Sequence, residues 1–224
     1  MKYRSSIAKL FLAIVVVTIS PALVAQTATP AVNFAQGTLV APSGAATFYG
    51  PSTTSTNATG ATQRPVEVRE LANGLGASKV IAGQLSASAY SDRVFQYVNT
   101  NIDTVFMYGL QKGALGAVLD QAGTPFDQAH LFVELLREAG NIPAIYVSGD
   151  ITLTPAQFQA WTGITNAVAA CRLLADGGIP AIVNGTASST CSYTGSVTSV
   201  VIAHIWVQAN GKLYDPSFKT YLVQ

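Results

Sequence analysis

The middle of the chain carries an amphipathic helix followed at once by an apolar strand. The helix is expected from Pro125 to about Gly140, because apolar side chains recur there at helical spacing: Ala129, Phe132, Val133, Leu136 and Ala139. Thr124 is suited to cap this helix, proline suits its first turn, and Asp127 carries the charge favoured at the positive end of a helix dipole. Residues 142–149 are apolar and extended in pattern, so the block predicts a helix packed against a sheet.

The other elements indicate a mixed fold. Short helices are expected over residues 91–101, 112–119 and 167–174, and a strand or extended arm over residues 101–108. Thr154-Pro155 has the capping residue and the first-turn proline of another helix start. Residues 198–208 are rich in β-branched side chains, and Asn210-Gly211 is a strong hairpin signal that would pair them with residues 212–214. Helices followed by antiparallel strands predict an α+β domain, with N-terminal helices packed on a small antiparallel sheet.

The N-terminus has the order of parts of a secretory signal. Lys2 and Arg4 precede an apolar run over residues 10–19, and Leu23-Val24-Ala25 offers a small residue for cleavage before Gln26. A signal peptide is therefore expected over residues 1–25, with export to the periplasm, the cell surface or the extracellular space. An uncleaved membrane anchor is the alternative, although the apolar run is short for crossing a bilayer.

Residues 26–65 are expected to be a low-complexity leader or linker, and residues 66–224 the folded domain. From Gln26 to Gln63 there is no charged residue, and Thr, Ala, Ser, Gly and Pro dominate. No helical or strand period holds in such a segment, which is typical of a linker.

The charge balance excludes one class of partner. Without Lys2, Arg4 and Lys9, which lie in the predicted signal peptide, the chain carries nine basic against eleven acidic residues. No basic patch remains for nucleic acid, so this partner is not expected. No second apolar stretch is long enough to predict a membrane span after signal cleavage.

Two cysteines, Cys171 and Cys191, lie in the part that is expected to be exported. In an oxidising compartment such a pair most often forms a disulfide, which here would close a loop rich in Gly, Ser and Thr. Two cysteines with two scattered histidines lack the ligand-pair spacing of a zinc site. Neither a metal site nor a cofactor is therefore expected.

Three separated segments point to a particular chemistry. The helix start at Thr124-Pro125 is followed much later by His204-Ile205-Trp206-Val207 and then by Asp215-Pro216-Ser217. A helix N-terminus, a strand histidine and a following aspartate are the three supports of a Cys-His-Asp thiol site. The histidine and the aspartate are present, but the helix begins with proline.

Together with the helix-to-strand block, these segments resemble the transglutaminase-like superfamily, which shares its core with papain-like cysteine enzymes. More narrowly, the chain resembles the exported bacterial branch whose helix opens with Gly-x-x-x-Asp-Gln-Ala, here Gly123 to Ala129. The resemblance covers about Val94 to Tyr221. It implies a papain/transglutaminase-like α+β core and a site for acyl transfer by a thiol.

The resemblance also implies roles for individual residues. The catalytic cysteine of active members falls on Pro125, His204 would be the base, and Asp215 would orient the imidazole. Proline supplies neither a nucleophile nor a backbone N–H at its own position. The chain is therefore predicted to be a non-catalytic domain that binds a peptide or a protein, with His204 and Asp215 as a remnant pair.

Two alternatives remain open. One is an active amide hydrolase or acyl transferase that uses Asp127, Thr124 or a rearranged site as the nucleophile. The other is a purely structural module of a longer surface protein, truncated at its C-terminus.

The sequence also predicts where three further side chains lie. Trp161 and Trp206 are expected to be packing anchors, with Trp206 also placed to line the groove as an auxiliary residue. His130 is expected near the solvent-facing side of the helix that begins at Pro125.

Overall fold

The computed structural model describes residues 33–34, 38–39 and 64–219. The predicted signal peptide, residues 1–25, lies outside the described residues, as does most of the predicted leader. Within the described ranges, no helix has both the length and the apolar character needed to cross a membrane.

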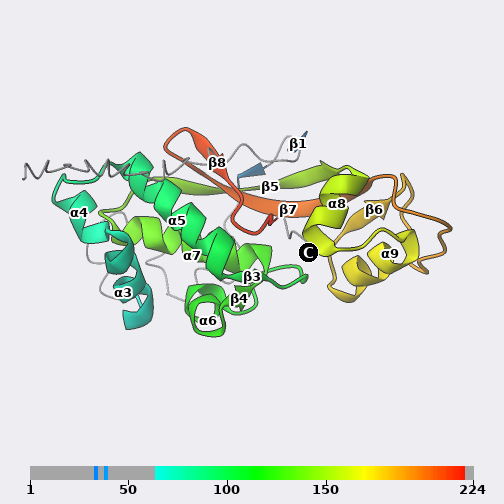
Figure 1. The fold of residues 1–224 in the computed structure, drawn as a ribbon, viewed down its shortest axis with the longest axis horizontal. Helices are drawn as coiled ribbons and strands as arrows, with labels where there is room; N and C mark the ends of the chain where they lie inside the picture. The colour runs from blue at the N-terminus through cyan, green and yellow to red at the C-terminus, as the bar shows by residue number, and fades with distance from the viewer. Residues whose placement is uncertain (1–32, 35–37, 40–63, 220–224) are drawn as a thin grey trace, which may run out of the picture.

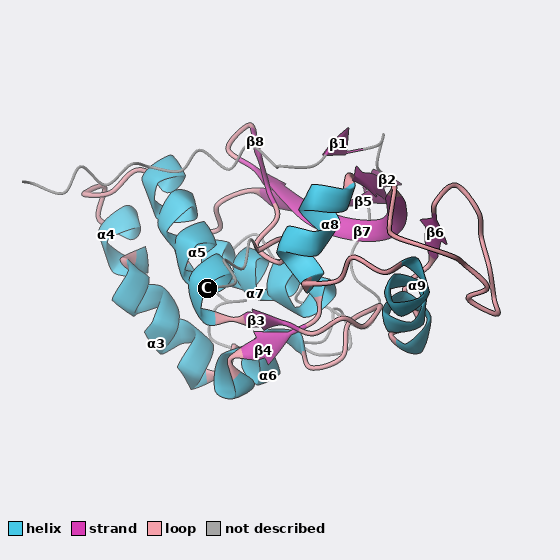
Figure 2. Cartoon of the chain, turned by 45° about the vertical axis from the view of Figure 1, so that its right-hand side comes forward, coloured by secondary structure: helices cyan, strands magenta, loops and turns pink. Residues whose placement is uncertain are grey.

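Five helices form one half of the domain (Figures 1 and 2). They are α3 (Val66–Leu75), α4 (Ala77–Ile81), α5 (Ala87–Asn101), α6 (Gly113–Asp120) and α7 (Pro125–Glu138). The central one is α7, because every residue from Pro125 to Leu136 is buried between the sheet and the other helices. Its apolar side chains form the first core cluster with those of α3, α5 and strand β7. A helix with this burial is held by packing rather than by intrinsic propensity.

The expectation that His130 lies near solvent is wrong. His130 is completely buried on α7, and its Nδ1 atom lies 2.9 Å from the hydroxyl of Tyr146. The apolar periodicity of α7 predicts one buried face and leaves His130 on the other, but the sheet packs against that other face as well. Burial, the largest cause, lowers the pKa of His130 to about 4.

The sheet is built around two long antiparallel strands. Strand β5 (Ala144–Leu153) pairs along its whole length with β7 (Val200–Ala209). Strand β6 (Ala181–Val183) pairs with one end of β7, and β8 (Lys212–Tyr214) pairs with the other end. A separate parallel pair, β3 (Asp103–Thr104) and β4 (Ala122–Gly123), lies beside α6 and α7.

Two short pieces of the predicted leader belong to the sheet. Strands β1 (Asn33–Phe34) and β2 (Thr38–Leu39) pair antiparallel with β5. They follow the edge of β5 that β7 leaves open, so backbone N–H and C=O groups on that edge gain partners.

A second core cluster lies at the other end of the sheet, under α8 (Pro155–Thr162) and α9 (Ala167–Asp176). The predicted disulfide is present here: Cys171 on α9 is bonded to Cys191 in the loop that leads to β7, with sulfur atoms 2.01 Å apart. The predicted α+β fold is thus confirmed, with helices packed on a small antiparallel sheet.

Local sequence signals set the ends of the elements that carry the site. Thr124 and Thr154 each accept a hydrogen bond from the third residue of the helix they precede, and both helices begin with proline. The two-residue loop Asn210-Gly211 has φ angles of 50° and 72°, the left-handed pair that a tight type I′ hairpin requires. This turn folds β8 back along β7.

Candidate functional site

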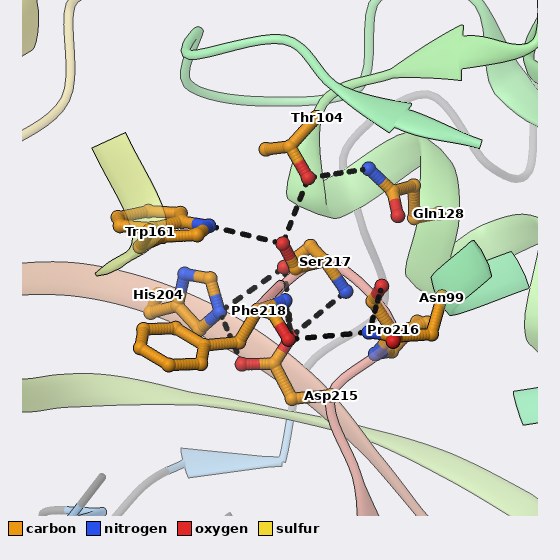
Figure 3. Close-up of polar contacts among 9 residues, drawn as sticks. All are labelled: Asn99, Thr104, Gln128, Trp161, His204, Asp215, Pro216, Ser217 and Phe218. Atoms are coloured by element: carbon orange, nitrogen blue, oxygen red, sulfur yellow. Dashed lines mark hydrogen bonds and ion pairs between the residues drawn. The ribbon is translucent and has the colours of Figure 1, made fainter. Parts of the chain in front are cut away.

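His204 on β7 and Asp215, which follows β8, form a buried pair (Figure 3). His204 lies in the middle of β7, and its Nε2 atom is 2.8 Å from Oδ2 of Asp215. Since Tyr214 of β8 pairs with Val207, the chain reaches Asp215 beside the part of β7 that carries His204. Both side chains are at most 4% exposed. The hairpin therefore brings together the histidine and the aspartate that the sequence motifs single out.

Asp215 is held as a carboxylate by its surroundings. Its Oδ1 atom accepts hydrogen bonds from the hydroxyl of Ser217 at 2.7 Å and from the backbone N–H groups of Ser217 and Phe218 at 3.1 and 3.2 Å. Burial alone would raise the pKa of Asp215, but the charge and hydrogen bond of His204 and the bonds from Ser217 outweigh it. The pKa of Asp215 is therefore lowered below its ordinary value.

A second set of hydrogen bonds fixes the backbone that follows Asp215 (Figure 3). The carbonyl oxygen of Ser217 accepts from Nε1 of Trp161 at 3.0 Å and from the hydroxyl of Thr104 at 2.7 Å. Gln128 on α7 in turn donates to the Thr104 hydroxyl at 3.1 Å. The loop is thus tied to α8, to β3 and to the first turn of α7. Thr104 and Ser217 were not among the predicted site residues; the Asp-Pro-Ser motif is the one sequence signal that points to Ser217.

Lys219 anchors the same loop from its far side. Its buried ammonium donates to the carbonyl oxygens of Val98 and Asn99 near the end of α5, at 2.9 and 2.6 Å. Burial, the largest cause, lowers the pKa of Lys219 to about 8, although the charges of Asp103 and Asp215 oppose it. The cation also lies where the dipole of α5 favours positive charge.

Pro125 and His204 line the same small cavity. Its other lining residues are apolar or aromatic: Met107, Tyr108, Phe126, Trp161, Ile179, Ile202 and Ala203. It leaves about 10 Å³ for the centre of a water molecule, which is room for about one water. The first turn of α7 and the side chain of His204 therefore face one space.

The two tryptophans differ in their relation to this cavity. Trp161 lines it, and its ring stands edge-on to the imidazole of His204 with centroids 6.0 Å apart. Trp206, the tryptophan expected to line the groove, is instead buried in the second core cluster and is not among the residues that line the cavity.

The segment at the mouth of the cavity is fixed to α9. Tyr108 donates its backbone N–H to the carbonyl oxygen of Gly177 at 2.8 Å, and its ring stands edge-on to Phe126. A Cβ atom on Gly177 would lie 2.0 Å from the carbonyl oxygen of Phe106. Glycine is thus needed where this segment crosses the end of α9. Met107 and Tyr108 remain 42% exposed at the mouth.

Asp127 and Thr124 are engaged in holding the helix start. Oδ1 of Asp127 accepts from the backbone N–H groups of residues 111–113, and Oδ2 accepts from the N–H and the hydroxyl of Thr124. The hydroxyl of Thr124 has one hydrogen, which it shares between Oδ2 of Asp127 at 3.1 Å and the carbonyl oxygen of Gly109 at 2.7 Å. Neither Asp127 nor Thr124 lines the cavity.

The hydroxyl oxygen of Ser217 lies 3.4 Å from Nε2 of His204. Nε2 is the nitrogen already bonded to Asp215. In a Ser-His-Asp relay the hydroxyl and the carboxylate occupy different nitrogens of the ring. Ser217 therefore holds the carboxylate of Asp215 in place by its hydrogen bond and is not positioned as a nucleophile. Within the described residues, no group of three or more His, Cys, Asp or Glu side chains is arranged to hold a metal ion.

A known family matches most of the described domain. Residues 76–214, more than half of the chain, match the family model described as the transglutaminase-like superfamily. The match includes Pro125 and His204 and ends one residue before Asp215. No curated protein and no solved structure gave a match. The chain belongs to the transglutaminase-like superfamily.

Proposed function

We propose that this domain binds an extended peptide or protein segment at the cavity beside His204 and does not catalyse acyl transfer. The observation that carries the proposal is that Pro125 and His204 line one cavity, while Asp215 holds His204 from outside that cavity through a 2.8 Å contact. The site thus keeps the base and its orienting carboxylate while the nucleophile position holds a residue without any nucleophilic atom.

The hydrogen bonds around the site argue against a displaced nucleophile. Both carboxylate oxygens of Asp127 accept bonds from the chain around the helix start. Cys171 and Cys191 are bonded to each other. An active enzyme would need one of these groups to leave its partners and reach the cavity.

A peptide-display selection against the chain from residue 26 tests the binding proposal. Met107→Arg places a charge at the mouth of the cavity and should abolish binding of the enriched peptides, because an apolar side chain would no longer enter. Ile81→Arg is the matched control, since Ile81 is also an exposed apolar residue but lies on α4 and does not line the cavity. Enriched peptides that bind both variants alike, or no enrichment at all, would sink the proposal.

We also propose that the chain is exported. The signal-like N-terminus supports this, and the Cys171–Cys191 disulfide suits an oxidising compartment. Mass spectrometry of protein recovered outside the cytoplasm should find an N-terminus at Gln26. Intact protein confined to the cytoplasm would contradict it.

A further inference from the structure

We propose that the cavity beside His204 selects a hydrogen-bond donor, an N–H or O–H group on a compact apolar body, through the Nδ1 atom of His204. The inference rests on the proposed function, because it gives the chemistry of the ligand for the same site. The inference is about which side of a hydrogen bond the site supplies: His204 would accept a hydrogen bond from the ligand.

The bond to Asp215 determines which ring nitrogen of His204 carries hydrogen. Oδ1 of Asp215 accepts three hydrogen bonds, from the hydroxyl and N–H of Ser217 and from the N–H of Phe218, and these donors favour the carboxylate form of Asp215. A carboxylate can only accept, so the 2.8 Å contact between Oδ2 and Nε2 needs the hydrogen on Nε2.

Ser217 supports the same assignment. Its hydroxyl hydrogen points to Oδ1 of Asp215 along the shorter contact of 2.7 Å. At 3.4 Å from Nε2, the same hydroxyl oxygen can therefore act only as a second, weak acceptor. Both neighbours of Nε2 thus require an N–H at that position.

Nδ1 of a neutral imidazole protonated on Nε2 carries a lone pair. Among the residues that the structure describes, none is hydrogen-bonded to Nδ1 of His204, and Figure 3 shows this atom pointing away from Asp215 and Ser217. The nearby indole N–H of Trp161 does not fill the role, because it donates to the carbonyl oxygen of Ser217.

The rest of the cavity strengthens this preference. Its walls are apolar side chains and aromatic rings, and Pro125 brings no N–H to the start of α7. A guest that donates to Nδ1 gains a hydrogen bond that a guest with only acceptor atoms cannot make, so the donating guest is preferred. A bare carbonyl or ether oxygen would meet the Nδ1 lone pair directly.

The size of the cavity limits the guest. The space of about 10 Å³ takes one water, so anything larger has to displace Met107 or Tyr108 at the mouth. Both side chains are 42% exposed and therefore have room to move outward. A compact donor group on a peptide, entering past these two residues, fits this geometry.

Pyrrole and furan provide the test, because these rings have similar size and differ in an N–H against an oxygen. Each is titrated into ¹⁵N-histidine-labelled chain from residue 26 at about pH 8, where a histidine is ordinarily neutral. The sequence has two histidines, so His130→Phe assigns the ¹⁵N signals of His204 unambiguously. We expect Nδ1 of His204 to be the unprotonated nitrogen, and pyrrole to bind at least tenfold more tightly than furan.

His204→Phe keeps an aromatic ring and removes the acceptor, so the preference for pyrrole should fall below twofold. If this variant does not fold, the ¹⁵N shift of Nδ1 in the unmodified chain still tests the assignment. A hydrogen on Nδ1, equal binding of the two rings, or binding of neither would overturn the inference. The proposed function is tested separately by the selected peptides. If their binding is lost in Met107→Arg, peptide binding at the cavity holds even where the pyrrole and furan results overturn the donor preference.

Discussion

Replacement of Asp127 tests whether this carboxylate is a structural clamp or a displaced nucleophile. Oδ1 accepts from three successive backbone N–H groups, of residues 111–113, at 2.8–3.0 Å. Oδ2 accepts from the N–H of Thr124 at 3.0 Å and from its hydroxyl at 3.1 Å. One side chain thus joins the start of α6 to the start of α7.

The expected loss of unfolding free energy follows from the N–H groups that Asp127→Ala would leave without an acceptor. The N–H groups of Gly113 and Thr124 are in buried bonds, while those of Gln111 and Lys112 are partly buried and can bind water instead. A buried donor without a partner costs about 1–3 kcal/mol, so we expect the free energy of unfolding to fall by about 4 kcal/mol. Asp127→Asn keeps one acceptor oxygen and should cost about half as much.

Urea denaturation followed by tryptophan fluorescence measures the effect, since Trp161 and Trp206 are both buried. Asp120→Asn is the matched control: Asp120 pairs with Lys112 at 2.7 Å but is largely exposed, and its loss should change stability by less than about 0.5 kcal/mol. An Asp127→Ala protein within 1 kcal/mol of the unmodified chain would refute the clamp.

Three further predictions concern the core, the disulfide and the site. The pKa of His130 is about 4 in the folded protein and ordinarily about 6.5, so its stabilising contribution is complete above pH 6.5 and is lost as pH falls toward 4. The loss should reach about 3 kcal/mol at pH 4, and His130→Gln should remove this slope from a series of denaturation curves; an unchanged slope would contradict it. Replacing both Cys171 and Cys191 with serine should lower the free energy of unfolding by about 3 kcal/mol, as expected for a loop of 20 residues, and no change in the denaturation midpoint would contradict it. Pro125→Cys should yield a thiol that iodoacetamide alkylates at pH 6 at least tenfold faster than in Pro125→Cys/His204→Ala; equal rates would place His204 out of reach.

The sequence predicts best the elements whose ends carry local signals. Proline and a capping threonine start α7 and α8, and Asn210-Gly211 defines the β7–β8 turn. The pairing of His204 with Asp215 follows from that turn, because it sets the register of two neighbouring strands.

Contacts between distant segments were beyond sequence reasoning. The carbonyl of Ser217 receives donors from Trp161, 56 positions away, and from Thr104, 113 positions away. Backbone carbonyls leave no trace in a residue pattern, so neither donor could be identified. The burial of His130 was missed for a related reason: periodicity reports one apolar face and not the sheet that covers the opposite one.

Turnover is the most direct test of the claim that Pro125 leaves the His204–Asp215 pair without a nucleophile. Release of ammonia from a glutamine-containing peptide, in the presence of a primary amine, should be followed for the unmodified chain and for His204→Ala. We predict that both release ammonia only at the rate of buffer alone. Ammonia release by the unmodified chain that His204→Ala abolishes would contradict the account, because it would show that the pair still serves a working nucleophile.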